Sequence, residues 1–144
     1  MGQMDRWQAI GAGLAALLIH AASWAEEPAA ANAEKLLREW QAKLDGSVWE
    51  IELIPESDRT IRIQDKLSFR AGQVTSEALL KEGYGSSNFS SRLQSDGAGT
   101  WETMQSKPEE GIVFLRGDVQ GETVQGAMSK RPTNGEPANF SFFG

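Results

Sequence analysis

Residues 46–144 alternate apolar and polar side chains with a period of two, and short turn-forming segments interrupt this alternation repeatedly. A period of two places successive side chains on opposite faces of an extended strand, whereas a helix requires a period of about 3.6. Near the start of this region Trp49, Ile51 and Leu53 alternate with two glutamates. The pattern predicts an all-β fold for most of the chain.

Eight predicted strands follow one another, joined by segments rich in Gly, Pro, Asp and Ser that form tight turns. They are residues 49–53, 61–69, 74–80, 83–93, 99–106, 112–119, 123–130 and 138–143. Consecutive strands joined by tight turns pair antiparallel, and eight of them can close into a barrel without exposed edges. The sequence therefore predicts an all-β, eight-stranded antiparallel up-and-down barrel. A β-sandwich is the alternative, although no connection has the length of a Greek-key crossover.

The first 25 residues have the layout of a secretory signal peptide. Residues 9–22 are rich in Ala, Leu, Ile and Gly, and Ser23 and Ala25 supply small side chains where a signal peptidase requires them. The alternative is an uncleaved anchor, but this apolar run is shorter than the roughly 20 residues that a membrane span needs. We therefore expect an exported protein, periplasmic or secreted, that begins at Glu26.

A short segment separates the predicted leader from the predicted barrel. Residues 26–33 are rich in Ala and Glu, which suggests a mobile linker. Residues 32–44 then place their apolar side chains on one helical face, namely Leu36, Leu37, Trp40 and Leu44. This helix is expected either to cap the barrel or to bind a partner. The predicted domains are thus a signal peptide (1–25), a linker with a short amphipathic helix (26–45) and a barrel (46–144).

The residue types of the mature chain exclude several kinds of site. The single histidine, His20, lies in the predicted leader, and the chain contains no cysteine. Histidine-based triads, thiol nucleophiles, Cys/His metal sites and disulfides are therefore excluded together. The net charge of −6 argues against nucleic acid or an anionic membrane as partner.

Several segments resemble a family of small exported bacterial proteins for which no activity is established. They are LDGSVWE at 44–50, DKLSF at 65–69, WETMQS at 101–106, GAMSK at 126–130 and FSFFG at 140–144. In architecture the chain is also similar to the calycins, the lipocalin and avidin class of barrels, which implies binding of a ligand. The chain departs from lipocalins at the first strand, where Gly46 and Trp49 are one residue farther apart than in the lipocalin motif Gly-x-Trp. The long C-terminal helix and the disulfide of lipocalins are missing as well.

The apolar residues predicted to face inward, Ile61 and Ile63 among them, are numerous enough to fill the barrel. An eight-stranded barrel nevertheless has room for either packed side chains or one small ligand. If a ligand binds, we expect its contacts among seven residues of the interior and mouth: Trp49, Asp65, Phe69, Tyr84, Phe89, Trp101 and Met128.

Asp65 has the same parity as Leu67, so an unbroken strand would point its carboxylate inward. A buried carboxylate requires a partner, which could be the polar head group of a ligand. The alternative, which is common in barrels, is a bulge at residues 64–66 that turns Asp65 to solvent. We expect the bulge.

Two hypotheses for the function follow, and neither is enzymatic. In the first, an exported, lipocalin-like barrel carries an apolar small molecule. In the second, a filled barrel binds or inhibits another exported protein, such as a hydrolase, through its loops or its helix, and exposes an apolar patch. The glutamates Glu50, Glu52 and Glu102 alternate with apolar residues and should face outward, which argues against an acid–base pair in a cleft. We therefore expect no catalytic residue, no cofactor and no metal.

Overall fold

A computed structural model describes the backbone of residues 26–144 and the side chains from residue 29 onward. The predicted leader lies outside these residues. The elements are α1 (Glu26–Leu44), β1 (Val48–Pro55), β2 (Ile63–Arg70), β3 (Gln73–Ser76), α2 (Glu77–Lys81), β4 (Ser87–Leu93), β5 (Gly99–Lys107), β6 (Gly111–Gln120), β7 (Thr123–Pro132) and β8 (Ala138–Phe143). Neither of the two described helices combines the length and the apolar character that a membrane crossing requires.

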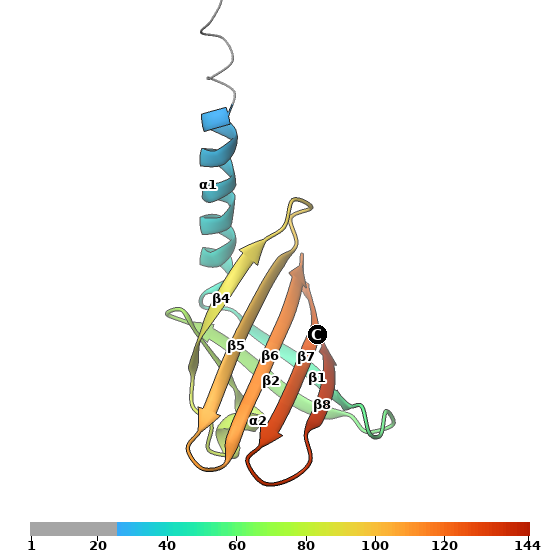
Figure 1. Ribbon diagram of the computed structural model, residues 1–144. Coiled ribbons are helices and arrows are strands. Elements are labelled where there is room, and N and C mark those ends of the chain that lie inside the picture. Colours follow the sequence, from blue (N-terminus) through green and yellow to red (C-terminus); the bar gives the residue numbers. More distant parts are fainter. Residues whose placement is uncertain (1–25) are drawn as a thin grey trace, which may run out of the picture. The chain divides into compact units, whose positions relative to one another are not determined.

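The eight strands form a closed barrel in chain order (Figure 1). Each strand pairs antiparallel with the next, and β8 returns to β1, with Phe142 opposite Leu53. Each of the described strands therefore has two neighbours, and the shortest ladder joins β3 to β4 at two residue pairs, Gln73 with Asn88 and Val74 with Ser87. The predicted up-and-down barrel is confirmed, and the alternative of a sandwich is wrong.

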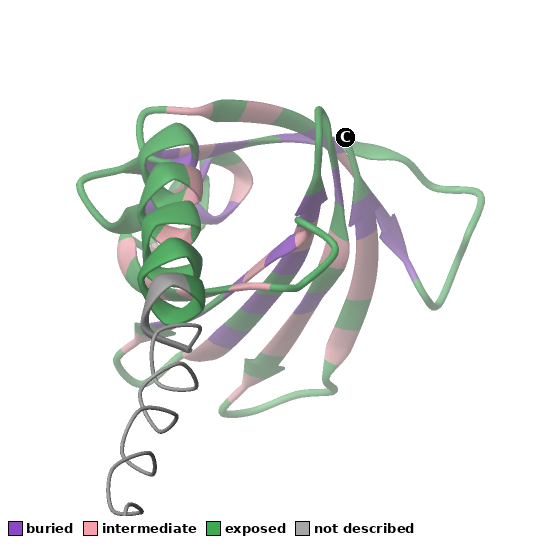
Figure 2. Cartoon of the chain, turned by 90° about the horizontal axis from the view of Figure 1, so that it is seen from above, coloured by how far each residue is buried: buried purple, intermediate pink, exposed green. Residues whose placement is uncertain are grey.

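Buried and exposed residues alternate along the strands, as the period of two predicts (Figure 2). The inward side chains form one core, in which Trp101 is the largest fully buried residue. Its ring centroid lies 5.0 Å from that of Phe69, edge to face, and 6.3 Å from that of Phe142. Aromatic rings in contact therefore fill the middle of the barrel.

Two glycines make room for these rings. A Cβ atom at Gly117 would lie 2.6 Å from the Trp101 indole. A Cβ atom at Gly126 would lie 2.1 Å from the carbonyl oxygen of Arg116 and 2.4 Å from the Phe142 ring. The rings and the backbone thus occupy the space that larger side chains would need.

The described residues divide between Ala33 and Glu34, and the part of α1 from Glu34 onward belongs with the barrel. Trp40 packs so closely over Gly99, at the first residue of β5, that a Cβ atom there would lie 1.9 Å from its ring. Gln41 donates a 2.8 Å hydrogen bond from Nε2 to the Ser91 hydroxyl. The last turns of α1 therefore pack against the barrel where β4 ends and β5 begins.

The structure corrects two expected segment boundaries. Helix α1 begins at Glu26, so residues 26–33, which were expected to form a linker, are the first turns of the helix. Their alanines account for this, since alanine has the highest helix propensity. The strand expected at residues 74–80 ends at Ser76, and the chain turns into α2.

Two predicted core residues are exposed instead. Ile61 precedes β2 and is 44% exposed, while Ile63 is 38% exposed. Ile63 and Leu53 form the last residue pair of the β1–β2 ladder, where the barrel wall ends. A residue with the parity of the inward-facing side chains is therefore not buried where the strand leaves the barrel wall.

Candidate functional site

The sequence-predicted ligand contacts belong to the packed core. Phe69, Trp101 and Met128 are each at most 1% exposed. The other aromatic candidates are half-buried and pack against that core: Trp49, Tyr84 and Phe89. These six side chains therefore belong to the core or pack against it.

Asp65 points inward, and the expected bulge is absent. The β1–β2 pairing runs without interruption through Asp65, which lies opposite Ile51. The side chain is 7% exposed, and the prediction that it faces solvent is therefore wrong. Its carboxylate accepts hydrogen bonds from the Ser76 hydroxyl (2.6 Å) and from the backbone N–H groups of Ala78 (2.8 Å) and Lys66 (2.7 Å). These bonds satisfy the buried charge.

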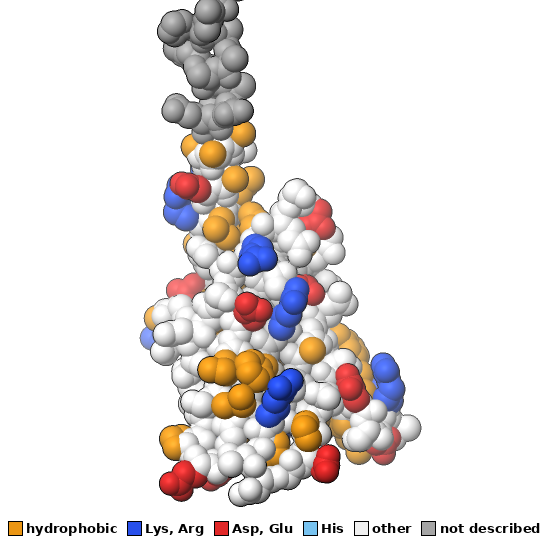
Figure 3. Space-filling model, viewed as in Figure 1, with side chains coloured by type: hydrophobic (Ala, Val, Ile, Leu, Met, Phe, Trp, Pro, Cys, Tyr) orange, Lys and Arg blue, Asp and Glu red, His pale blue; other side chains and the backbone are white. Residues whose placement is uncertain are grey.

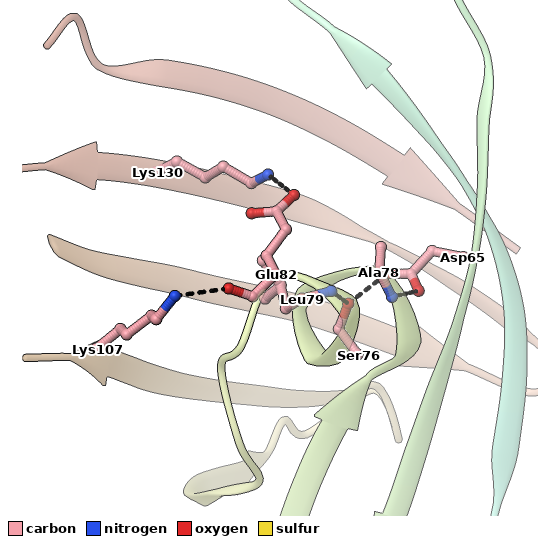
Figure 4. Close-up of polar contacts among 7 residues, drawn as sticks. All are labelled: Asp65, Ser76, Ala78, Leu79, Glu82, Lys107 and Lys130. Atoms are coloured by element: carbon pink, nitrogen blue, oxygen red, sulfur yellow. Dashed lines mark hydrogen bonds and ion pairs between the residues drawn. The ribbon is translucent and has the colours of Figure 1, made fainter. Parts of the chain in front are cut away.

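The partners of Asp65 show that it positions α2 (Figure 4). Ser76 is the N-cap of this helix, and its hydroxyl also accepts a 3.1 Å hydrogen bond from the N–H of Leu79. At the other end of the helix, the Glu82 carboxylate pairs with Lys130 at 2.7 Å, and its carbonyl accepts a 3.0 Å bond from Lys107. Helix α2 is thus held at both ends.

Helix α2 covers the end of the barrel opposite α1. Lys107 is the last residue of β5, whereas α1 packs at the first residue of the same strand, Gly99. The helix directs Leu79, 1% exposed, into the core. Helix α2 therefore closes this end of the interior.

Two polar atoms of the interior lack a hydrogen-bond partner among the described residues. They are Nε1 of Trp101 and Oε1 of Gln105, whose side chains are 0% and 3% exposed. Gln105 uses its other polar atom, Nε2, in a long 3.4 Å contact with the carbonyl of Val74. A buried polar atom without a hydrogen-bond partner lowers the stability of the fold, so a polar ligand in the interior would form its most favourable hydrogen bonds with these two atoms.

A hollow of about 730 Å³ lies on the outside of the barrel, over β4, β5, β6 and β7. It is lined by Asn88, Phe89, Ser90, Glu102, Thr103, Met104, Phe114, Leu115, Arg116, Ala127 and Ser129. Most of these side chains have outward parity and are exposed. The volume is in the range typical of ligand sites.

Cross-strand pairs build the floor of this hollow, which we call the outer hollow. Met104 on β5 lies opposite Phe114 on β6, and the two side chains are 54% and 39% exposed. The guanidinium of Arg131 lies 5.6 Å from the centroid of the Phe114 ring. Figure 3 shows hydrophobic side chains gathered over β5 and β6, with charged side chains around them.

A charged pair lies beside the apolar floor. Glu102 on β5 lies directly opposite Arg116 on β6, and Arg116 in turn lies opposite Ala127 on β7. Neither Glu102 nor Arg116 forms an ion pair within 4.0 Å with another described residue. The outer hollow therefore combines apolar surface with charges that are available to a partner.

Sequence reasoning predicted the outward direction of Glu102 but missed the outer hollow. The sequence signal that could have indicated the outer hollow is the presence of two apolar residues, Met104 and Phe114, at strand positions that face outward. Each is unremarkable alone, since single exposed apolar residues are common. Only the strand register, which the sequence does not contain, places them opposite each other.

No cluster among residues 29–144 brings together enough His, Cys, Asp or Glu side chains for a metal ion. The pKa of Asp58 is lowered from its ordinary value of 3.8, first by the hydroxyl of Thr60 (2.6 Å) and then by the Thr60 N–H (3.0 Å). Asp58 lies in the exposed turn after β1, away from the outer hollow.

Comparison with known proteins identifies no relative. Neither the protein-family models, nor the curated proteins, nor the solved structures contain a match to this chain.

Proposed function

We propose that this chain is an exported, non-enzymatic interaction protein that binds another polypeptide on the outer wall formed by β4–β7. The observation that carries the proposal is the outer hollow itself, an apolar floor at Met104 and Phe114 with an unpaired Glu102 and Arg116 beside it. Exposed apolar surface of this kind costs free energy in water, and a partner that covers it recovers that free energy.

The packed interior supports the same proposal. A carrier needs an open cavity, but Trp101, Phe69 and Phe142 fill the middle of this barrel, and α2 directs Leu79 into the core from one end. Of the two functions considered from the sequence, the filled barrel with an exposed apolar patch therefore agrees better with the geometry.

Site-specific photo-cross-linking in the producing cell tests the proposal. A photoactivatable phenylalanine analogue replaces Met104 or, as matched control, Phe143, which is 49% exposed on the outer face of β8 and does not line the outer hollow. We expect a discrete adduct with a second polypeptide from position 104 alone. Absence of that adduct, or the same adducts from both positions, would contradict the proposal.

The second candidate function is the carriage of a small molecule inside the barrel. The observation in its favour is the pair of unpartnered polar atoms, Trp101 Nε1 and Gln105 Oε1. Native mass spectrometry of protein recovered gently from the producing organism tests it. A reproducible small added mass would support the carrier, and a bare mass would count against it.

A further inference from the structure

The outer hollow continues into a second, more polar hollow of about 170 Å³. The two share Ser90, Glu102 and Arg116, and the second adds Arg92 and Thr100 among its lining residues. Together they form one groove on the outside of β4–β7. The groove is apolar at the Met104–Phe114 end and polar at the other.

The charge of this groove differs in sign from that of the whole chain. Its charged lining residues are two arginines, Arg92 and Arg116, and one glutamate, Glu102. The chain as a whole carries a net charge of −6. None of these three residues has an ion-pair partner within the described part of the chain. The groove therefore favours an anionic group, which would form a charge-assisted hydrogen bond with a guanidinium.

The backbone of the groove indicates how a partner is recognised. Strand β6, which carries Phe114 and Arg116, is paired along its length with β5 on one side and β7 on the other, so a partner cannot add a strand there and must be recognised by side chains. Most of the side chains that line the groove are also exposed to solvent. A free small molecule would remain partly wetted there, whereas a segment of a polypeptide is covered by the rest of its own protein.

The spacing along β6 adds a pattern to this recognition. Phe114 and Arg116 are two residues apart, and both point outward. Side chains two residues apart on a strand are separated by about 6.5–7 Å on the same face. An extended peptide has the same repeat, so an apolar side chain on Phe114 leaves the side chain two positions away beside Arg116.

We infer that the partner presents an extended segment with an apolar side chain seated on Met104 and Phe114 and, two residues away, an aspartate or glutamate paired with Arg116. This inference rests on the proposed function, because it identifies the chemistry of the polypeptide that the outer hollow binds.

Selection from a display library of random 12-residue peptides on the immobilised full chain tests the inference. We expect enriched peptides to carry an aromatic or aliphatic residue two positions from an acidic residue. Arg116→Glu should weaken these peptides about tenfold or more, because an attractive pair becomes a repulsive one, and should select basic residues at the acidic position. Arg116→Gln, which removes the charge alone, should have a smaller effect in the same direction.

Two further variants separate this inference from the proposed function. Phe114→Ser removes the apolar floor and should abolish binding, whereas Phe143→Ser is the matched control and should leave it unchanged. Peptides that require Phe114 but ignore the charge at position 116 would overturn the acidic pattern and leave the outer hollow as the binding face. Peptides that bind Phe114→Ser as well as the native chain would overturn both. Unchanged urea midpoints establish that each variant is folded.

Discussion

The two faces of β5 and β6 carry different kinds of information. Inside the barrel, Trp101 and Leu115 are at most 2% exposed and belong to one core. On the outside, Met104 and Phe114 lie on the same two strands, are also apolar, and remain 54% and 39% exposed. The same chemistry therefore serves stability on one face and is available for binding on the other. The period of two alone separates the two roles.

The largest expected difference between the faces is in stability. Trp101→Ala should lower the free energy of unfolding by about 3–5 kcal/mol, because it removes the residue at the centre of the core and leaves a cavity. Met104→Ala, on the same strand but facing outward, should change it by no more than about 0.5 kcal/mol. Urea denaturation followed by fluorescence or circular dichroism measures both. Equal losses would contradict the division of roles.

Glycine substitutions sharpen the comparison at the backbone. Gly126→Ala should cost about 1–3 kcal/mol, because the new methyl group would overlap the Arg116 carbonyl and the Phe142 ring. Gly85→Ala is the control, since a Cβ atom there has no neighbour within 4 Å among the described residues. Urea midpoints of the two variants provide the test. A tolerated Gly126→Ala would show that the barrel is less tightly packed than the distances indicate.

Asp65, at the end of the barrel where α2 packs, should contribute a similar or smaller amount to the free energy of unfolding. Asp65→Asn should cost about 1–3 kcal/mol, because the amide replaces one acceptor oxygen by a donor that faces other donors. Combined with Ser76→Ala, the loss should be smaller than the sum of the single losses by about 0.5–3 kcal/mol, since the two residues share one hydrogen bond. Glu102→Gln, on the exposed face, should stay within about 0.5 kcal/mol. Strict additivity would argue against Asp65 acting through Ser76.

The smallest expected effect concerns a fully exposed carboxylate. Hydrogen bonds from Thr60 favour the ionised form of Asp58 and hold its pKa below 3.8 in the folded chain. Asp58 therefore stabilises the fold above the unfolded pKa, and this contribution is lost as the pH falls through the lower, folded pKa. An NMR titration should show a higher Asp58 pKa in Thr60→Val, because the stronger of the two hydrogen bonds is gone. An unchanged pKa would contradict that assignment.

The sequence predicted the architecture because alternation and turns are local signals. Strand number, topology and the burial of Trp101 and Met128 all follow from them. It could not predict that β3 gives way to α2, because the competing influence is the carboxylate of Asp65, eleven positions before Ser76 in the chain. That carboxylate stabilises the helix N-cap only once the barrel has brought the two residues together.

The candidate site was less predictable than the fold. Its residues come from four strands, and most of them are ordinary surface residues by themselves. Pairs such as Met104 with Phe114 and Glu102 with Arg116 arise from the register of β5 with β6. Register depends on the packing of the opposite, inner face, so the outer hollow is a consequence of the core.

The central claim is that binding takes place on the outside of the barrel and not in its interior. The two methionines among the described residues, Met104 and Met128, allow a direct test. Met104 is 54% exposed beside the outer hollow, and Met128 is 1% exposed in the core. The full chain, with isotope-labelled methionine methyl groups assigned through Met104→Leu and Met128→Leu, is titrated with anilinonaphthalene sulfonate, an apolar anionic probe. We predict that the Met104 signal shifts with probe concentration while the Met128 signal does not. A shift of Met128 with Met104 unmoved would place the ligand inside the barrel and contradict the account.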